Sequence, residues 1–424
     1  MIDYCTNENI QDTHYEYGYT GDGVSIGMLE GFGEPDLQKA QFIGADITLD
    51  TTFLTDPQTQ QPNITTHATR VASIICSQGS QNCGIGIAPD SSVYCTYLMY
   101  DSDDEINIAD DEINISERIH SRIAWLIDKG VKIINVSCTL NTHNVYGDFD
   151  NYIDKITKEN SVVFVVASGN DGTDGVNSPG LAYNAITVGN INDNNTLGIS
   201  DDSLRPKSSY TNLLYLFHIP SKPDLCAYGT NIDVNGANDS GTSFSAPHVS
   251  GALALLIEQE WMLTYSPAVL KAIVTAGVHI GKHHYVPENR VVTTQNDNPE
   301  SSYIQYGAGI LNCLNNADIV DNCNYSFGYF GASSIGTTTI FLVANRIFRY
   351  AFVYRHPYDA TDFQNIDIFL LDPSGNTVAS SQTTTNNLEI IEYTPTVAGT
   401  YTIKIQHTGV TNYATYIGEA WIQH

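Results

Sequence analysis

Basic residues are scarce in this sequence. Its 424 residues include 18 Lys and Arg against 47 Asp and Glu, so the formal net charge is −29 at pH 7. Nucleic acids and anionic membrane surfaces are bound through clustered Lys and Arg, so we expect neither as a partner. Cationic or neutral peptides and bound cations fit the charge better, although an acidic surface also serves solubility alone.

Long hydrophobic runs are missing as well. No apolar stretch reaches the roughly 20 residues that cross a bilayer, so we expect no membrane span. Met1–Cys5 carries no secretory signal, which means that the chain either begins after processing or is made without one. Apolar residues still make up 42% of the chain, and its length suits one large domain with a smaller one.

Zinc-binding cysteine pairs are absent. Eight cysteines occur, but no two of them form a C-x-x-C motif, which argues against a zinc ribbon. The pairs close enough in sequence to form disulfides are Cys76 with Cys83 and Cys313 with Cys323. Cys138 and Cys226 lie in apolar segments, where a cysteine is usually a buried free thiol.

One stretch near the middle of the chain, Ser240–Val249, combines a tight turn with a helix start. A short strand is expected before it, at 231–234, and apolar residues at helical spacing follow it up to residue 257. Ser243 therefore lies where backbone amides and the positive end of a helix dipole can stabilise an oxyanion. An ordinary Ser/Thr N-cap before a buried helix would explain the stretch taken alone.

The same stretch resembles a known motif. Residues 241–251 read G-T-S-x-S-x-P-H-V-x-G, which is similar to the nucleophile motif of the subtilisin-like serine proteases, or subtilases. Ser243 would then be the nucleophile, and His248 is expected to pack rather than react. Three further motifs follow the family's order of acid, histidine, asparagine and serine, over residues of about 15–322.

The acid departs from the family pattern. A buried strand is predicted at 24–29 and ends at Glu30, where an open α/β sheet places its active-site groups. Subtilases have an aspartate here that orients the catalytic histidine. Glutamate is longer than aspartate by one carbon–carbon bond, about 1.5 Å. It can still accept the imidazole N–H if the backbone lies correspondingly farther from the histidine. Asp36 is the alternative acid, although its family counterpart is more often structural or a calcium ligand.

The histidine motif lies at the start of a predicted helix. His67 follows the capping residues Thr65 and Thr66, and the resemblance makes it the candidate general base. Ala68 replaces a glycine of the family motif, and Arg70 replaces a second histidine. A calcium-binding loop of many relatives corresponds to residues 78–84. The resemblance thus gives Asp36 and Gln78 as candidate metal ligands of a structural calcium, with no cofactor needed for the chemistry.

The oxyanion and substrate-binding residues follow two more predicted strands. Asn170 comes after the apolar run 162–167 and resembles the oxyanion-hole asparagine, with the Ser243 amide as the second donor. The family lines its substrate groove with the corresponding segments, which here are Ser137, Cys138, Thr139, Ala167, Ser168 and Gly169. Relatives read Ser-Leu-Gly-Gly from the first of these positions. The loss of both glycines in this chain is expected to reshape the specificity pocket.

Two other segments carry no catalytic constellation. The acidic insertion 101–112 echoes an EF-hand loop, but Ile106 stands where that loop needs glycine, so a solvated acidic loop is favoured over weak calcium binding. From about residue 324 short alternating strands predict an antiparallel β-sandwich, similar to the jelly-roll modules of many bacterial subtilases. We therefore expect a peptidase domain at 1–322 and an accessory sandwich at 323–424.

The resemblance implies a fold and a function. The expected fold class is α/β, a mostly parallel sheet flanked by helices, with the sandwich appended. The expected function is that of an extracellular or secreted serine endopeptidase acting on peptides or proteins through an acyl-enzyme, with Glu30, His67, Ser243 and Asn170 as its machinery. Two rivals stay open: a pseudoprotease that binds peptides, and a carbohydrate or matrix adhesin that uses the sandwich. The sequence does not indicate an oligomeric state.

Overall fold

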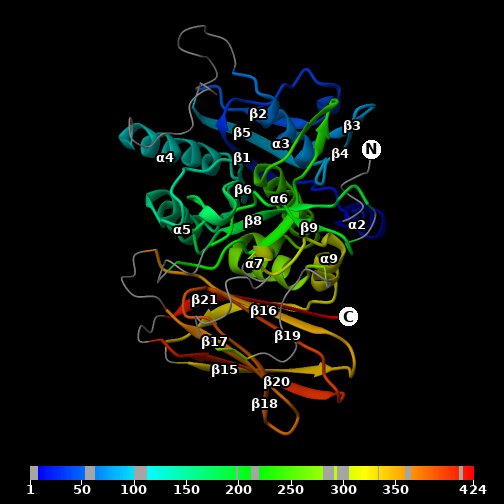
Figure 1. Ribbon diagram of the computed structural model, residues 1–424, viewed down its shortest axis with the longest axis vertical. Coiled ribbons are helices and arrows are strands. Elements are labelled where there is room, and N and C mark those ends of the chain that lie inside the picture. Colours follow the sequence, from blue (N-terminus) through cyan, green and yellow to red (C-terminus); the bar gives the residue numbers. More distant parts are fainter. Residues whose placement is uncertain are drawn as a thin grey trace.

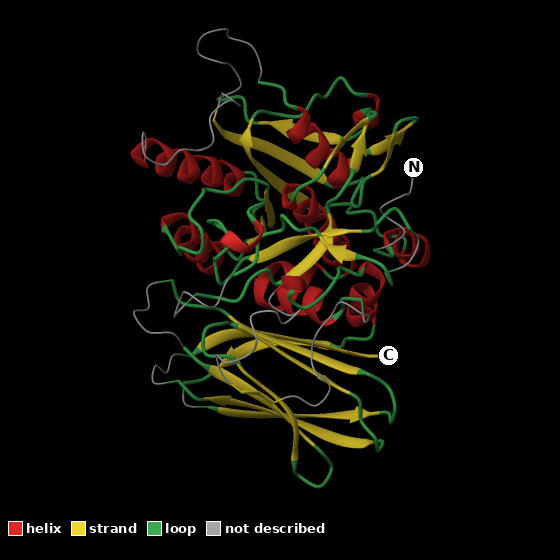
Figure 2. Cartoon of the chain, viewed as in Figure 1, coloured by secondary structure: helices red, strands yellow, loops and turns green. Residues whose placement is uncertain are grey.

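In the computed structural model, helices surround a twisted sheet in one half of the molecule, and stacked strands form the other half (Figure 1). The cartoon coloured by element type separates the two halves (Figure 2). The structure describes residues 8–52, 63–99, 112–196, 199–211, 219–279, 291–293, 305–332, 334–358, 364–409 and 414–424.

A mostly parallel sheet forms the centre of the first half. Its strand order is β10-β8-β7-β6-β1-β5-β2, with β9 pairing antiparallel to β8. Strands buried on both faces need continuous apolar runs, and Val163–Ala167 is such a run. The bounds are β1 Ser25–Phe32, β2 Asp46–Leu49, β5 Ser92–Met99, β6 Ile133–Val136, β7 Val163–Ala167, β8 Ile186–Asn192, β9 Ser203–Leu204 and β10 Leu225–Tyr228.

Helices cover both faces of this sheet. α3 and α6 pack on one face with the larger apolar core, whereas α4 and α5 pack on the other face with a second core. α6 is apolar on nearly every side and is buried along most of its length, as expected of a central helix. The helix bounds are α2 Ile10–Tyr17, α3 Thr66–Cys76, α4 Glu112–Asp128, α5 Asp148–Asn160, α6 Thr242–Gln259, α7 Pro267–Ala276 and α9 Cys313–Asp321.

Several short elements lie between the main strands and helices. Two are antiparallel hairpins, and the second of them leads directly into α6. The hairpins are β3 Gln78–Ser80 with β4 Cys83–Ile85, and β11 Ile232–Val234 with β12 Ala237–Asp239, and the 3-10 helices are Ala40–Phe42, Gly172–Asp174 and Trp261–Tyr265.

The register of three neighbouring strands brings their carboxyl ends level. Leu29 of β1 pairs with Val136 of β6, which in turn pairs with Val166 of β7. The residues that follow these positions therefore meet at one edge of the sheet, which is where open parallel sheets place their functional groups. The amino end of α6 reaches the same edge.

The second half is an antiparallel β-sandwich. A five-stranded sheet, β13-β18-β17-β20-β15, faces a four-stranded sheet, β14-β21-β16-β19, across an apolar and aromatic core. The bounds are β13 Val291–Thr293, β14 Tyr325–Phe330, β15 Ile335–Leu342, β16 Phe348–Tyr354, β17 Ile366–Leu371, β18 Thr377–Gln382, β19 Leu388–Tyr393, β20 Gly399–His407 and β21 Thr415–Gln423. The sequence pattern missed β14 and β18. It also assigned 291–293 to the first domain, whereas this segment pairs with β18.

The two halves share one apolar core. Residues of α7 and of the sandwich strands β16, β19 and β21 belong to the same buried cluster as α6. A Cβ placed on Gly418 would lie 2.3 Å from the backbone nitrogen of Val269, so only glycine lets α7 approach β21 this closely. Asn184 also exchanges two hydrogen bonds with the backbone of His356 across the boundary. The sandwich is therefore a structural part of the molecule.

Neither of the two cysteine pairs that are close in sequence forms a disulfide. Cys76 and Cys83 are both buried free thiols, and Cys323 is an exposed free thiol. Burial raises the pKa of the Cys76 thiol to about 12, so this group stays protonated and unreactive. Cys138 and Cys226 are free thiols as expected, half-buried and buried respectively.

The N-terminal segment packs against the body from residue 8 onward. Its Glu8 is fully buried, and the carboxylate contacts the Nδ1 atom of His248 on α6 at 2.6 Å. His248 is thus a packed residue of the central helix, as the sequence predicts. None of the helices in the described ranges is long and apolar enough to cross a membrane.

Candidate active site

Glu30 and His67 meet at the carboxyl end of the central strand. The Nδ1 atom of His67 lies 2.6 Å from the Oε2 atom of Glu30. The Glu30 side chain is completely buried, whereas 38% of the His67 side chain is exposed. One edge of the imidazole is therefore held by a carboxylate, and the other edge, with Nε2, is available for proton transfer. Asp36, the alternative acid, pairs with Lys39 instead.

The electrostatics of the pair favour a protonated imidazole. Burial lowers the pKa of His67, but the charge of Glu30 and the hydrogen bond to it outweigh burial and raise the pKa above its ordinary value. Burial also raises the pKa of Glu30, an effect that His67 partly offsets. An imidazolium is thus stabilised here as long as the buried carboxylate is ionised, which is what a general base requires when it accepts a proton.

The first turn of α3 fixes the backbone of His67. Thr65 has extended backbone angles, and its hydroxyl accepts a hydrogen bond from the Ala68 amide at 3.1 Å. This is an N-cap, and it starts the helix one residue before His67. The expected role of Thr65 as a cap is therefore confirmed.

Ser243 occupies the first turn of α6, and residues that follow β6 and β7 form hydrogen bonds with this turn. The Thr242 amide donates to the side chain of Asn170 at 3.1 Å. The Ser137 hydroxyl donates to the Ser243 carbonyl at 2.8 Å. The amino end of the helix is thereby tied to the ends of β7 and β6.

The Asn170 side chain and the Ser243 backbone N–H both lie close to Gly241. A Cβ placed on Gly241 would lie 3.5 Å from the side-chain nitrogen of Asn170, 3.6 Å from its side-chain oxygen and 3.8 Å from the Ser243 backbone nitrogen. Because residue 241 is glycine, no side chain fills this space. The two groups that the sequence predicts as oxyanion donors are therefore near each other at the start of α6.

His67 and Ser243 are linked through Phe244. The ring centroids of His67 and Phe244 are 5.1 Å apart, so the imidazole lies beside the residue that follows the serine. Among the described residues no hydrogen bond joins the Ser243 hydroxyl to His67. Catalytic hydrogen bonds are often loose without substrate and tighten when it binds.

Comparison with protein families identifies the family of this chain. The profile described as "Subtilase family" matches residues 30–309, which is more than half of the chain. The chain belongs to the subtilase family. Subtilases are serine peptidases, so the protein is a subtilisin-like hydrolase. Within the sandwich, residues 356–407 match the bacterial pre-peptidase C-terminal domain.

Individual relatives agree with this assignment. Subtilisin BL of Lederbergia lenta is 27% identical over 249 residues, which are 56% of this chain and 78% of the relative. A subtilisin-like protease of Coccidioides posadasii is 43% identical over 105 residues, but the match spans only 24% of either protein. The self-cleaved protease domain of PatA has the same fold, with a TM-score of 0.51 at 22% identity over 72% of this chain and 98% of that chain.

The expected groove residues of this subtilase divide into two groups. Cys138 and Thr139 are partly exposed, whereas the other four are buried. The buried ones are Ser137, Ala167, Ser168 and Gly169. Ser137 supports the nucleophile turn from beneath, and Gly169 has a positive φ of 108° and a backbone packed against Ser209. Because these four residues are buried, their side chains form part of the interior next to the site, and only their backbone atoms are candidates for substrate contact.

The two candidate calcium ligands have other contacts in this subtilase. The Asp36 carboxylate pairs with Lys39 at 3.4 Å and accepts the Gln38 amide. The Gln78 side-chain nitrogen donates to the Pro89 carbonyl at 2.5 Å. No group of three His, Cys, Asp or Glu that could hold a metal occurs in the described ranges. The acidic insertion 101–112 lies almost entirely outside those ranges.

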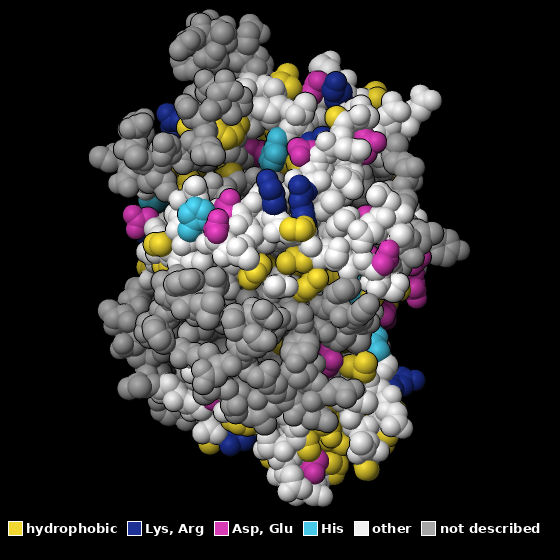
Figure 3. All heavy atoms as spheres, viewed as in Figure 1, with side chains coloured by type: hydrophobic (Ala, Val, Ile, Leu, Met, Phe, Trp, Pro, Cys, Tyr) yellow, Lys and Arg dark blue, Asp and Glu magenta, His cyan; other side chains and the backbone are white. Residues whose placement is uncertain are grey.

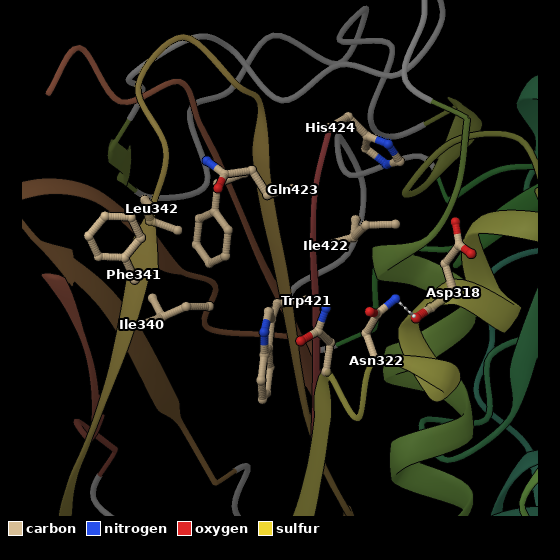
Figure 4. Close-up of a pocket in the computed structure, with 11 residues that line it drawn as sticks. Asp318, Asn322, Ile340, Phe341, Leu342, Trp421, Ile422, Gln423 and His424 are labelled. Atoms are coloured by element: carbon tan, nitrogen blue, oxygen red, sulfur yellow. Dashed lines mark hydrogen bonds between the residues drawn. The ribbon is translucent and has the colours of Figure 1, made fainter. Parts of the chain in front are cut away.

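A pocket of about 360 Å³ lies at the junction of the sandwich and α9, away from the catalytic residues (Figure 4). Trp421 and Phe341 line it on the sandwich side, and Asn322 and Asp318 lie on the helix side, joined by a hydrogen bond. Its polar groups are largely engaged in the fold; the amide of Gln423, for example, donates to the Val343 carbonyl. None of the residues that line the pocket is a candidate catalytic residue.

The molecular surface agrees with the charge of the sequence. On the face shown in Figure 3, the Lys and Arg side chains are few, and no continuous basic area is visible.

The sequence pattern missed several residues that build the site. It did not predict that Ser137 holds the serine turn or that Phe244 lies against His67. Arg70 was noted only as a departure from the family motif, yet it is buried and its guanidinium lies 5.0 Å from the centre of the Phe244 ring. The signal available in the sequence was an arginine three residues after the candidate base, at the position where the family has a second histidine.

Proposed function

We propose that this subtilase is an endopeptidase that hydrolyses peptide bonds with a Glu30–His67–Ser243 triad. The observation that carries the proposal is the 2.6 Å contact between Glu30 and the Nδ1 atom of His67, which leaves Nε2 as the ring nitrogen not held by Glu30 in a partly exposed side chain. The position beside Ser243 that Asn170 and the Ser243 amide border supports it further.

The proposed reaction proceeds in two halves. The Ser243 hydroxyl attacks the substrate carbonyl while His67 accepts its proton at Nε2, and the negative oxygen is stabilised by the Asn170 side chain and the Ser243 amide. His67 then gives the proton to the leaving amine, and an acyl-enzyme forms on Ser243. Water attacks this ester by the same path in reverse, which releases the acid and restores the serine. Glu30 holds the imidazole tautomer and stabilises the imidazolium throughout.

A serine-directed phosphonate probe tests the proposal. We expect mass spectrometry to find the label on Ser243 of the full chain. Labelling should be lost in His67→Ala, because the nucleophile then lacks its base. His120→Ala is the matched control, since His120 is an exposed residue of α4 on the opposite face of the sheet. It should label like the wild type.

The rival function is a pseudoprotease that keeps the fold and binds peptides without cleaving them. Glu30 in place of aspartate motivates it, as does the altered segment after Ser137, where the Leu140 amide bonds to the Ser178 carbonyl at 2.7 Å. A folded protein that neither labels nor cleaves a mixed peptide library, yet retains a peptide, would replace the endopeptidase by this function.

We also propose that the protein acts outside the cell, where its unfolded peptide substrates would be found. The family and the sandwich module support this location. Recovery of the activity only from the intracellular fraction of a native culture would contradict the extracellular proposal.

The same peptide assay with and without a chelator decides whether a structural calcium contributes.

A further inference from the structure

Arg70 lies close to His67, where α3, the hairpin strand β12 and the first turn of α6 meet. It follows His67 by three residues on α3, so both side chains project from the same face of the helix. Only 4% of its surface is exposed. A buried guanidinium in a helix of small and apolar residues is costly unless it is bound on several sides.

The guanidinium of Arg70 is bound on at least three sides. Its Nη2 atom donates to the Ala237 carbonyl at 2.9 Å, and its Nη1 atom lies 3.3 Å from the Asp239 carboxylate. Its face lies 5.0 Å from the centre of the Phe244 ring, within the range of a cation–π contact. His67 contacts the same ring, at a centroid separation of 5.1 Å.

These contacts connect both halves of the proposed catalytic pair. Ala237 and Asp239 belong to the hairpin strand β12, which ends four residues before Ser243. Phe244 directly follows the serine, and Arg70 shares a helix with the base. One guanidinium therefore joins the helix of His67 to the chain segments on either side of the nucleophile.

We propose that Arg70 is a positioning residue that fixes His67 relative to Ser243 and balances the charge around the imidazole. The inference rests on the proposed peptidase function. Glu30 of β1, Asp239 of β12 and Arg70 of α3 are the charged groups that act on His67. The two carboxylates favour the imidazolium, whereas the guanidinium disfavours it, so the pKa of His67 reflects all three.

Kinetics of four full-length variants test the role of Arg70. In Arg70→Met we expect kcat to fall roughly 10- to 100-fold with little change in KM, because a base displaced by about 1 Å loses that much rate. In the pH profile of kcat/KM, the acid limb, where activity is lost as His67 becomes protonated, should move to higher pH. The reason is that the positive charge of Arg70 no longer disfavours the imidazolium. Arg70→Lys keeps the charge but loses the planar fork, so kcat should fall while the limb stays in place.

The other two variants separate charge from structure. Asp239→Asn removes a carboxylate from an exposed side chain, so it should fold normally and move the acid limb to lower pH. Arg346→Met at an exposed turn of the sandwich is the control and should match the wild type. A purely structural role for Arg70 would lower the rate without moving the limb in either direction.

An NMR titration tests the inference without turnover. The His67 ring is followed in full-length Ser243→Ala, with its signal identified by comparison with His67→Gln. Adding Arg70→Met should raise the measured pKa of His67, and adding Asp239→Asn should lower it. An inactive wild-type protein would defeat the proposed function but leave this measurement intact.

Two results would overturn the inference. One is a folded Arg70→Met chain with wild-type kcat and an unchanged His67 titration. The other applies if Arg70→Met does not fold. An Asp239→Asn protein with an unchanged His67 titration and an unchanged kcat would then rule out both the charge balance around His67 and the positioning role of Arg70.

Discussion

The length of the acid is the sharpest test of the catalytic site. Replacing Glu30 by aspartate restores the residue that subtilases have at this position, yet we expect Glu30→Asp to impair the enzyme. Removal of one carbon–carbon bond withdraws the carboxylate by about 1.5 Å. The present contact is 2.6 Å, so a fixed backbone would leave about 4 Å between the carboxylate and Nδ1, which is beyond a hydrogen bond.

The backbone has little freedom to compensate. Residue 30 lies inside β1, which is hydrogen-bonded to β5 on one side and β6 on the other, and its side chain is fully buried. A misplacement of this size costs about 100-fold in rate, or about 2.7 kcal/mol of transition-state stabilisation. Glu30→Gln keeps the length and loses the charge, so it serves as the matched comparison, with an expected loss of roughly 10²–10⁴.

The assay is the pH dependence of kcat/KM on a peptide substrate. Catalysis needs neutral His67, and Glu30 raises the pKa of His67, so activity is lost as the pH falls through this raised value. Weakening the contact lowers that pKa and should move the acid limb to lower pH in both variants. Glu30→Asp with a rate within about threefold of the wild type, against the roughly 100-fold loss argued above, would refute the reasoning.

Two further predictions concern stability. Gly418→Ala should lower the free energy of unfolding and separate the two halves in thermal melts, because its Cβ would lie 2.3 Å from the Val269 nitrogen, whereas Gly328→Ala, with no atom within 4 Å, should be neutral. Lys271 is buried against Asp224, and burial lowers the pKa of its amine to about 7. The unfolded chain therefore binds this proton more tightly, so Lys271 makes stability rise with pH above 7. Lys271→Met should flatten that rise by about 2 kcal/mol between pH 7 and 9, as measured by urea unfolding; an equally steep rise in both proteins would contradict it.

The sequence was most informative where local pattern and local structure coincide. The helix expected to begin within Ser240–Val249 forms α6, and the apolar run before Asn170 forms β7. Apolar periodicity is a property of neighbouring residues, so these elements could be read directly. The strands β14 and β18 were missed because their pattern is weak: Gly328 interrupts β14, and β18 is built mostly of small and polar residues.

Contacts between distant segments had no comparable signal. Glu8 and His248 are 240 positions apart, and nothing in either neighbourhood indicates that they pair inside the molecule. Nearness of Cys76 and Cys83 in sequence suggested a bridge, but the thiols stay free. Short separation permits a disulfide only when the two side chains also point at each other, and that depends on the fold.

The sequence by itself determined the family, the order of the motifs and the identity of the candidate residues, because reactive groups must appear at turn and helix-start positions with recognisable spacing. Only the tertiary structure decided that Glu30 rather than Asp36 reaches His67, that Ser137 lies beneath the nucleophile and that Arg70 joins the segments around it. The physical reason is that such contacts depend on strand register and helix packing to within about an ångström, a tolerance set by the hydrogen bond and not by the order of residues.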